Sequence, residues 1–395
     1  MPYNFDQVFD RRLTNSTKWG QYPEDVLPLW VADMDFQTPA PILDALRSSL
    51  ELGILGYDLQ INKLQEIAAQ RMDRLYAWNV TPEMVVVTPG IVSGFNVAAR
   101  TVCPPDGGLL IQVPVYFPFL SVSENAELTR QVAPLKLIKD GSHLSYQVDF
   151  NLFKSSFHSN GARTKMFLLC NPHNPTGNMF IREELEKFAE ICLENDVLIC
   201  SDEIHSELVL GDSHHIPIAS ISPEIADHTI TLISPSKTFN VPGLFCGLAI
   251  IPDPGLRERY KKQLDLLTLH VNSLGIISAQ TALSGVCDDW LLELRSYLRN
   301  NRDFLLQFID EFIPGIHPTN PDATYLAWLD CNELIKDGRI QGSPFDFLLK
   351  HAKVALNDGA TFGLGGEGFV RLNFGCPRST LIDGLERMNK ALRRS

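Results

Sequence analysis

Short apolar runs alternate with amphipathic stretches of helical length between residues 82 and 252, and this alternation constrains the fold more than any other feature of the sequence. From Leu185 to Leu193, apolar residues recur at the i, i+3, i+4, i+7 and i+8 spacing of a helix face. Strands that are apolar on both faces and are joined by helices form a mostly parallel sheet. The predicted fold class is therefore α/β, with a central, mostly parallel sheet and helices on both faces. The predicted strands are 84–88, 109–113, 165–170, 197–200, 230–233 and 247–251.

The segments outside this alternation predict a second, smaller α+β domain. An amphipathic helix at 288–312 leads into it, followed by a strand at 323–329, a helix near 345–352, a strand at 369–374 and a closing helix. The first fifty-odd residues are too few to fold alone, so we expect them to pack on this C-terminal part. The predicted domains are a large one, 56–287, and a small one made of 1–55 with 288–395.

Composition excludes several classes of function. The net charge of −13 and the lack of a basic run argue against nucleic acid and an anionic membrane as partners. The N-terminus shows no apolar run of the kind that a secretory signal has. No uncharged stretch is apolar enough to span a membrane. The eight cysteines include no C-x-x-C pair, which favours reduced thiols in a cytoplasmic protein over disulfides or a metal site.

Lys237 lies in the stretch SPSKTFNVPG, just after the predicted strand 230–233. A lysine at the end of a buried strand is costly to desolvate unless something there uses the amine. Three interpretations are open: a surface lysine on a loop, the S-x-x-K pattern of serine acyl-enzymes, and a lysine that holds pyridoxal phosphate as a Schiff base. The S-x-x-K enzymes also need S-D-N and K-T-G elements, and here Glu203 and Phe239 stand at the third positions.

Polar residues follow other predicted strands, as ligand-binding residues do at the carboxyl edge of an open α/β sheet. Gly90 and Ile91 open a helix whose free N–H groups suit a phosphate, although a plain strand-to-helix turn has the same pattern. Asn174 lies in the loop NPHNPTG, for which a simple β-turn is the alternative. Asp202 ends a buried strand, where a carboxylate needs a cation or several donors. A protonated pyridine nitrogen would serve, unless Asp202 caps a following helix.

Asn174, Asp202 and Lys237 thus arrive in chain order at successive strand ends, downstream of a phosphate-type turn. With this arrangement the chain resembles the fold-type I pyridoxal-phosphate enzymes of the aspartate aminotransferase superfamily. Within them it is most similar to the MalY/PatB group of cystathionine β-lyases and cysteine C–S lyases. The motifs that carry the resemblance span the chain: LWVADMDF at 29–36, DEIH at 202–205, HIP at 215–217, PSKTFN at 235–240 and RLNF at 371–374.

The resemblance implies an enzyme that binds pyridoxal 5'-phosphate on Lys237 and acts on a small amino acid. The implied reaction is cleavage of L-cystathionine or a related cysteine S-conjugate to thiol, pyruvate and ammonia, begun when Lys237 removes the α-proton. A class I/II aminotransferase is the alternative, because it shares the same residues. A non-catalytic binding or regulatory protein that kept the fold is a more remote one.

The resemblance also implies roles for the residues around the cofactor. Asp202 would pair with the pyridine nitrogen, and Asn174 with the phenolic oxygen of the ring. Tyr116 would stack on the ring, and Tyr116 and Tyr57 are candidate proton donors to the leaving sulfur. Arg371 would bind the substrate α-carboxylate through its bidentate fork, with Ala32 and Asn174 nearby. The expected phosphate contacts are Gly90, Ile91, Ser234 and Tyr57, the last from the neighbouring subunit of a homodimer.

Two positions depart from the wider superfamily. His205 replaces the aminotransferase tyrosine three residues after the aspartate, as in the lyase group, and is expected at the cofactor without a defined contact to the ring oxygen. Phe245 replaces a phosphate-binding arginine, which leaves the phosphate to amides, hydroxyls and Tyr57. The G-x-G-x-x-G pattern at 363–368 precedes a strand and is expected to be a turn. His214 and its neighbour His215 lack a third ligand, which favours a polar loop over a metal site.

Overall fold

The computed structural model describes residues 3–51, 53–56 and 61–393, and its largest sheet consists of seven strands: β2 (Val85–Thr88), β3 (Gly108–Val113), β4 (Thr129–Pro134), β7 (Thr164–Cys170), β8 (Leu198–Asp202), β9 (Thr229–Ile233) and β10 (Gly247–Ile250). Their order is β2-β10-β9-β8-β7-β3-β4. Only β10 runs antiparallel to its neighbours, β2 and β9. The prediction of a mostly parallel α/β sheet is confirmed.

The six predicted strands are present, and the sequence pattern missed the seventh, β4. Every residue of β3 and β9 is buried, which explains why these strands appear in the sequence as continuous apolar runs. By contrast, β4 lies at the edge of the sheet, pairs with β3 alone and is only half-buried. It therefore has polar residues among its apolar ones, and it lacks the signal of a central strand.

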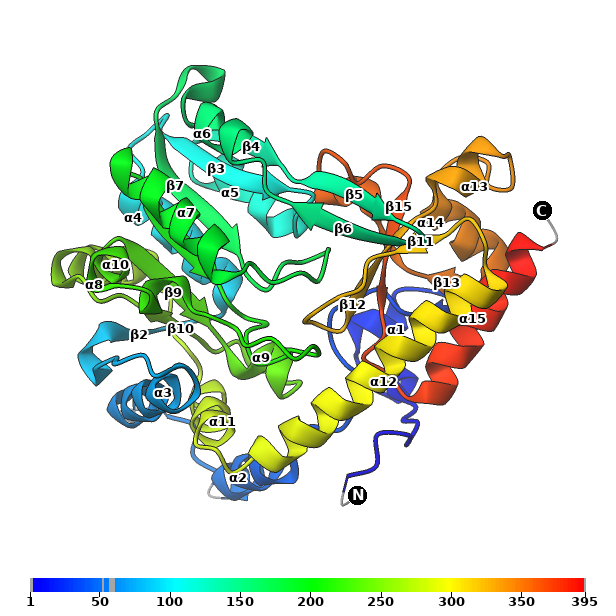
Figure 1. Cartoon of the computed structure of the whole chain (residues 1–395). Coiled ribbons are helices and arrows are strands. Elements are labelled where there is room, and N and C mark those ends of the chain that lie inside the picture. The colour runs from blue at the N-terminus through cyan, green and yellow to red at the C-terminus, as the bar shows by residue number, and fades with distance from the viewer. Residues whose placement is uncertain (1–2, 52, 57–60, 394–395) are drawn as a thin grey trace.

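Helices cover both faces of this sheet (Figure 1). Alternate residues of β7 point to opposite faces, so that Met166 and Leu168 belong to one apolar cluster and Phe167 and Leu169 to another. The first cluster is closed by α4 (Ile91–Val102), α5 (Phe117–Asn125) and α10 (Pro254–Leu266). The opposite face is covered by α6 (Phe150–Ser155), α7 (Arg182–Glu194), α3 (Ile61–Tyr76) and α11 (Ser273–Leu283).

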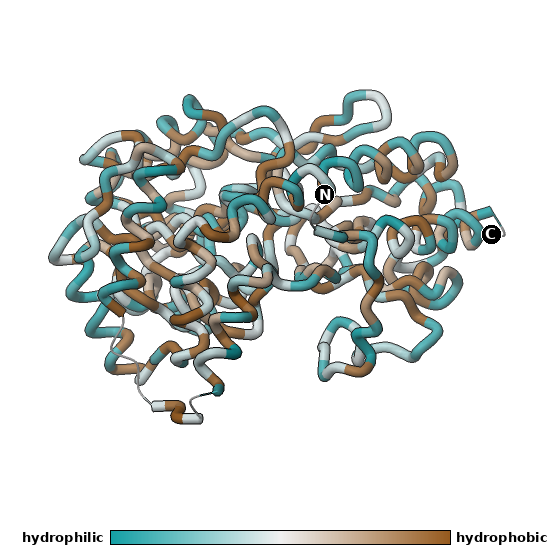
Figure 2. The backbone as a smooth tube through the Cα atoms, turned by 90° about the horizontal axis from the view of Figure 1, so that it is seen from below, coloured by the Kyte–Doolittle hydropathy of each residue, from teal (hydrophilic) through white to brown (hydrophobic). Residues whose placement is uncertain are grey.

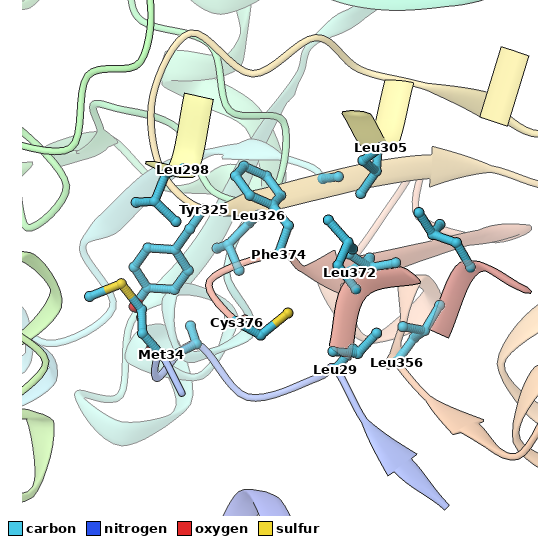
Figure 3. Close-up of a cluster of buried hydrophobic side chains, with 14 of the residues drawn as sticks. Leu29, Met34, Leu298, Leu305, Tyr325, Leu326, Leu356, Leu372, Phe374 and Cys376 are labelled. Carbon is cyan, nitrogen blue, oxygen red and sulfur yellow. Dashed lines mark hydrogen bonds between the residues drawn. The ribbon is translucent and has the colours of Figure 1, made fainter. Parts of the chain in front are cut away.

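A second, antiparallel sheet has the order β11-β12-β15-β14. Its strands are β11 (His317–Pro318), β12 (Leu326–Asp330), β14 (Asn357–Asp358) and β15 (Phe369–Asn373). It packs against α12 (Asp288–Phe312) and α15 (Arg378–Leu392), and Figure 3 shows Leu298 and Leu305 of α12 above Leu326 and Leu372. The predicted helix near 345–352 is present as α14 (Pro344–Phe347) and a π-helical turn, Leu348–Ala352.

The N-terminal segment touches both parts of the molecule. β1 (Leu27–Pro28) pairs with β13 (Val354–Ala355), whereas α2 (Ala40–Glu51) packs on α11. The division into domains at residues 56 and 288 stays a prediction.

A hairpin of β5 (Lys136–Asp140) and β6 (His143–Gln147) reaches from the large sheet to the small one (Figure 1). Leu144 forms a β-bridge with Thr319. The indole N–H of Trp328 donates to the Tyr146 hydroxyl at 3.0 Å. The large and small sheets are therefore joined by this hairpin as well as by the main-chain connections.

Hydrophobic and hydrophilic residues alternate along the helical turns in Figure 2, as amphipathic helices require. Within the described residues, no helix is both long and apolar enough to cross a membrane. No group of three or more His, Cys, Asp or Glu side chains in this part of the chain could hold a metal ion. All eight cysteines are free thiols, and seven of them are buried.

We expect Leu298→Ala to lower the free energy of unfolding by about 2–5 kcal/mol, because Leu298 is fully buried between α12 and the small sheet. Leu292 on the same helix is 67% exposed and is the matched control. Leu292→Ala should change stability by no more than about 0.5 kcal/mol. Urea unfolding followed by circular dichroism measures both, and equal effects would contradict this packing.

Candidate active site

A cavity of about 350 Å³ lies at the carboxyl ends of β7, β8 and β9. Parallel strands end at the same edge of a sheet, so residues that follow different strands meet there. β10 runs the other way, and its start adds Phe245 and Cys246 to the rim. The predicted site residues that line the cavity are Ala32, Gly90, Ile91, Tyr116, Asn174, Asp202, His205, Ser234 and Lys237.

Lys237 projects into this cavity from α9 (Pro235–Thr238), and its Nζ donates a hydrogen bond to the Ala32 carbonyl at 2.7 Å. Burial lowers the pKa of Lys237 to about 8, against the opposing attraction of Asp33 and Asp202. A substantial fraction of the amine is therefore neutral at mildly alkaline pH, and the neutral amine is the form that attacks a carbonyl or takes a proton. The alternative of a surface lysine is excluded.

Asp202, the last residue of β8, is buried and has a single hydrogen-bond donor among the described residues: its Oδ1 accepts from the Ile204 amide at 3.1 Å. Burial raises the pKa of Asp202 to about 7. The chain continues as a turn and not as a helix, so Asp202 is not a helix cap. A buried carboxyl with so few donors has room for a further donor from a ligand in the cavity.

Arg371 lies behind Asn174 and does not line the cavity itself. Its Nη1 donates to Asn174 Oδ1 at 2.9 Å, and its Nη2 to Asn357 Oδ1 at 2.6 Å and to the Trp30 carbonyl at 3.1 Å. The Nε is buried without a partner in the described chain. Burial lowers the pKa of Arg371 to about 10. Among the described residues no carboxylate pairs with this cation, so it suits a carboxylate ligand.

One end of the cavity has the features of an anion site. Gly90 has a φ of +90°, a backbone conformation that favours glycine, and it turns the chain from β2 into α4. The first N–H groups of α4 lack partners within the helix, and their residues line the cavity. The Ser234 hydroxyl is also present, donating to the Cys246 carbonyl at 2.7 Å. Phe245 lies at the rim, 63% exposed and with a left-handed φ of 46°.

His205 is buried on the cavity wall, and its Nδ1 has no partner in the described chain. Burial lowers the pKa of His205 to about 3, and the nearby Lys237 and Arg371 add to this shift, so the imidazole is neutral. The ring of Tyr325 packs edge-on against it, with 6.0 Å between ring centroids. The Tyr325 hydroxyl donates to the same Ala32 carbonyl at 2.8 Å.

Sequence reasoning missed Tyr325 and Asn357, for which no pattern in the sequence gives a signal. It did include Asn240 and Asn373, inside the quoted motifs, without assigning them a contact. The prediction for Tyr57 falls outside the described residues. The turn at 363–368 is confirmed before β15.

The two adjacent histidines lie in a loop, as predicted, but the ring of His215 is buried. Its Nε2 lies 2.7 Å from Glu203 Oε2. The ring of His215 packs against the ring of Tyr76 and is close to the buried Glu203 carboxylate, and both contacts keep it buried. His214 is exposed.

We predict that the Lys237 amine becomes reactive with a midpoint near pH 8, because burial favours its neutral form. Brief acetylation of the full chain across pH, with mass spectrometry of the peptide 235–243, measures this midpoint. Lys187 is the internal control: its pKa is raised by Glu190, so its reactivity should rise only at higher pH. If both lysines titrate together, the cavity does not desolvate Lys237.

Comparisons with known proteins agree with this geometry. Residues 24–388 match the family of class I and II aminotransferases. The chain is 38% identical to cystathionine beta-lyase PatB of Bacillus subtilis, over 98% of this chain and 100% of that protein. It superposes on the PLP-bound C-S lyase from Staphylococcus hominis with a TM-score of 0.90, at 32% identity, over 99% and 98% of the two chains.

Cystalysin from Treponema denticola, solved with a pyridoxal 5'-phosphate cofactor, gives a TM-score of 0.91 at 30% identity over both full chains. The resemblance predicted from the sequence motifs is thereby confirmed. The match covers nearly the whole chain, and it includes the strands and loops that form the cavity. The chain belongs to the class I and II aminotransferase family of fold-type I enzymes.

Proposed function

We propose that the protein is a pyridoxal-phosphate-dependent C–S β-lyase that cleaves L-cystathionine or related cysteine S-conjugates to thiol, pyruvate and ammonia. One observation carries the proposal: a lysine of lowered pKa and a buried carboxyl line one cavity, and an arginine without a carboxylate partner among the described residues lies directly behind Asn174 of its wall. Relatives named as cystathionine β-lyases and C–S lyases, which match over nearly their whole length, support the reaction class.

The residues of the cavity fit pyridoxal phosphate. Lys237 is the one lysine in the described lining and would hold the aldehyde carbon. Asp202, with its single donor, would accept from the ring nitrogen, and Tyr116 would lie against the ring. Asn174 and His205 would face the ring oxygen, where the free Nδ1 of His205 offers a partner. The phosphate would lie at the start of α4, near Gly90, Ile91 and Ser234.

When bound, pyridoxal phosphate supplies an electron sink for a negative charge at the substrate α-carbon. The chain's own residues then place the substrate. Arg371 would hold the α-carboxylate, with Asn174 and the Ala32 backbone beside it. The Nζ of Lys237 would take the α-proton. Burial raises the pKa of Tyr116, so its hydroxyl stays protonated and can donate to the departing sulfur.

The cavity favours a lyase over an aminotransferase of dicarboxylic acids. Apart from Lys237, no lysine or arginine is found among the described residues of the lining. The second carboxylate of a dicarboxylic substrate would therefore lack a cationic partner, whereas the alkyl half of an S-alkyl cysteine needs none and L-cystathionine carries its own ammonium beside its distal carboxylate. The aspartate aminotransferase of Pyrococcus horikoshii is 25% identical to this chain, compared with 38% for cystathionine beta-lyase PatB.

The reaction can be tested with L-cystathionine, L-cysteine and S-alkyl cysteines, with and without a 2-oxo acid. We expect free thiol and pyruvate in both cases, because elimination needs no amino-group acceptor. Lys237→Ala should bind the amino acid and release no thiol, since no amine remains to take the α-proton. Turnover that requires the oxo acid and returns a new amino acid would instead identify an aminotransferase.

We propose further that the active unit is a homodimer in the cytoplasm and that Tyr57 reaches the phosphate of the neighbouring subunit. Ile54 and Leu55, just before Tyr57, are exposed apolar residues. Val92 and Phe245 at the cavity rim are exposed as well. A partner subunit that covers these residues would bury them and would close the rim of the cavity.

Mixing Lys237→Ala chains with Tyr57→Phe chains tests this arrangement. A mixed dimer has one site with both residues intact, so full exchange should restore about a quarter of the wild-type activity. The two variants assayed separately after the same unfolding and refolding steps are the control. If the mixture is no more active than the separate variants, Tyr57 acts within its own chain.

A further inference from the structure

The backbone of residues 30–34 is here called the strap, and its Ala32 lines the cavity. Successive carbonyl groups of the strap alternate between two sets of hydrogen-bond donors. The Trp30 carbonyl accepts from Arg371 at 3.1 Å, and the Ala32 carbonyl accepts from Lys237 at 2.7 Å. The carbonyls of Val31 and Asp33 both accept from the side-chain amide of Asn373, at 2.6 and 2.7 Å. The carbonyls of Trp30 and Ala32 therefore contact the two site residues, whereas those of Val31 and Asp33 are held by Asn373.

Asn240 lies in the turn after α9, three residues after Lys237, and anchors the strap from that side. Its Oδ1 accepts from the Met34 amide at 3.0 Å. Its Nδ2 donates to the Met34 carbonyl at 2.9 Å and to the Phe36 carbonyl at 2.7 Å. Asn373 comes from β15 of the small sheet, the strand that also carries Arg371. Each asparagine thus ties the strap to the element that carries one of the two site residues.

Two cationic side chains, Arg11 and Lys18, also contact the end of this segment. Arg11 donates to Asp33 at 2.7 Å and to Asp35 at 2.6 Å. Lys18 is fully buried and contacts Asp35 at 2.8 Å and the Asp33 carbonyl at 3.2 Å. The buried pair of Lys18 and Asp35 is costly to separate, so it restrains the chain at the end of the strap.

We propose that the strap is a positioning element that sets the spacing between Arg371 and Lys237, with Asn240 and Asn373 as positioning residues. The inference rests on the proposed function, because it concerns an α-amino acid held between these two groups. When the α C–H bond breaks, the proton would go to Nζ of Lys237 and the electron pair to the sink that pyridoxal phosphate would supply. The ammonium that forms then donates to the Ala32 carbonyl.

Asn240→Gly is the sharpest test of the strap. Asn240 has a left-handed φ of 56°, which glycine adopts freely, so this variant removes the side-chain amide and keeps the backbone conformation. Asn160→Gly is the matched control: Asn160 has a φ of 58°, and its amide donates to the Arg130 carbonyl, outside the strap. Asn373→Ala removes the second anchor and provides an independent variant if Asn240→Gly folds poorly.

Three readouts separate positioning from general stability. Amide hydrogen exchange by mass spectrometry reports order in the peptide that contains residues 30–36. Cofactor absorbance gives the number of loaded sites. The third is the rate at which L-alanine exchanges its α-proton in D₂O, per loaded site. Alanine has no β-leaving group, so this rate reports proton removal by Lys237 without elimination.

In Asn240→Gly we expect faster amide exchange in the strap and an alanine exchange rate per loaded site about 10- to 100-fold lower, because small displacements of reacting groups are costly. Asn160→Gly should match the wild type. If amide exchange in the strap becomes faster but the alanine exchange rate per loaded site is unchanged, the inference is wrong. It is also wrong if amide exchange in the strap does not change. A wild-type chain that exchanges alanine but releases no thiol would refute the lyase proposal alone. A wild-type chain that binds no cofactor would refute both.

Discussion

Desolvation of three charged groups, two that line the cavity and one directly behind its wall, is the physical constraint on which the site depends. Burial lowers the pKa of Lys237 and of Arg371 and raises that of Asp202, so each group is held in an environment that disfavours its charge. Such an arrangement destabilises the folded chain unless a ligand or a neighbouring dipole compensates. The compensation within the chain is partial: backbone carbonyls face the two cations, and one amide faces the carboxyl. The site is therefore prepared for a ligand that carries complementary groups.

The strap gives a physical reason why motifs from distant parts of the sequence occur together. The segment 29–36 supplies carbonyls, the segment 235–240 supplies Lys237 and Asn240, and the segment 371–374 supplies Arg371 and Asn373. These segments are more than 130 residues apart along the chain, yet they are in direct hydrogen-bonding contact. Because the contacts are made to backbone carbonyls, a change in one motif affects the geometry of the other two.

The parts of the fold that could be predicted from sequence are those with strong local signals. Strands buried on both faces, such as β9, and the long helix α12 were found because their apolar residues follow one simple pattern. Lys237, Asp202 and Asn174 could be placed together because parallel strands end at one edge. Arg371 came from resemblance alone. Tyr325 could not be found, because it reaches the Ala32 carbonyl only through packing of the small sheet. The partners of Asn240 could not be predicted either, because they are backbone groups, which every residue has and which give no sequence signal.

The hairpin β5–β6 has a consequence for how the chain works over time. It joins the large sheet to β11 and β12 through the bridge at Leu144, the Tyr146–Trp328 hydrogen bond and a 3.0 Å ion pair between Lys139 and Asp330. Together with the strap and α12, it connects the two sheets in three separate places. Sliding of one sheet past the other is thereby restrained, and the reacting groups are arranged during folding instead of at each catalytic cycle. We expect a cavity fixed in this way to change little in shape when a substrate binds.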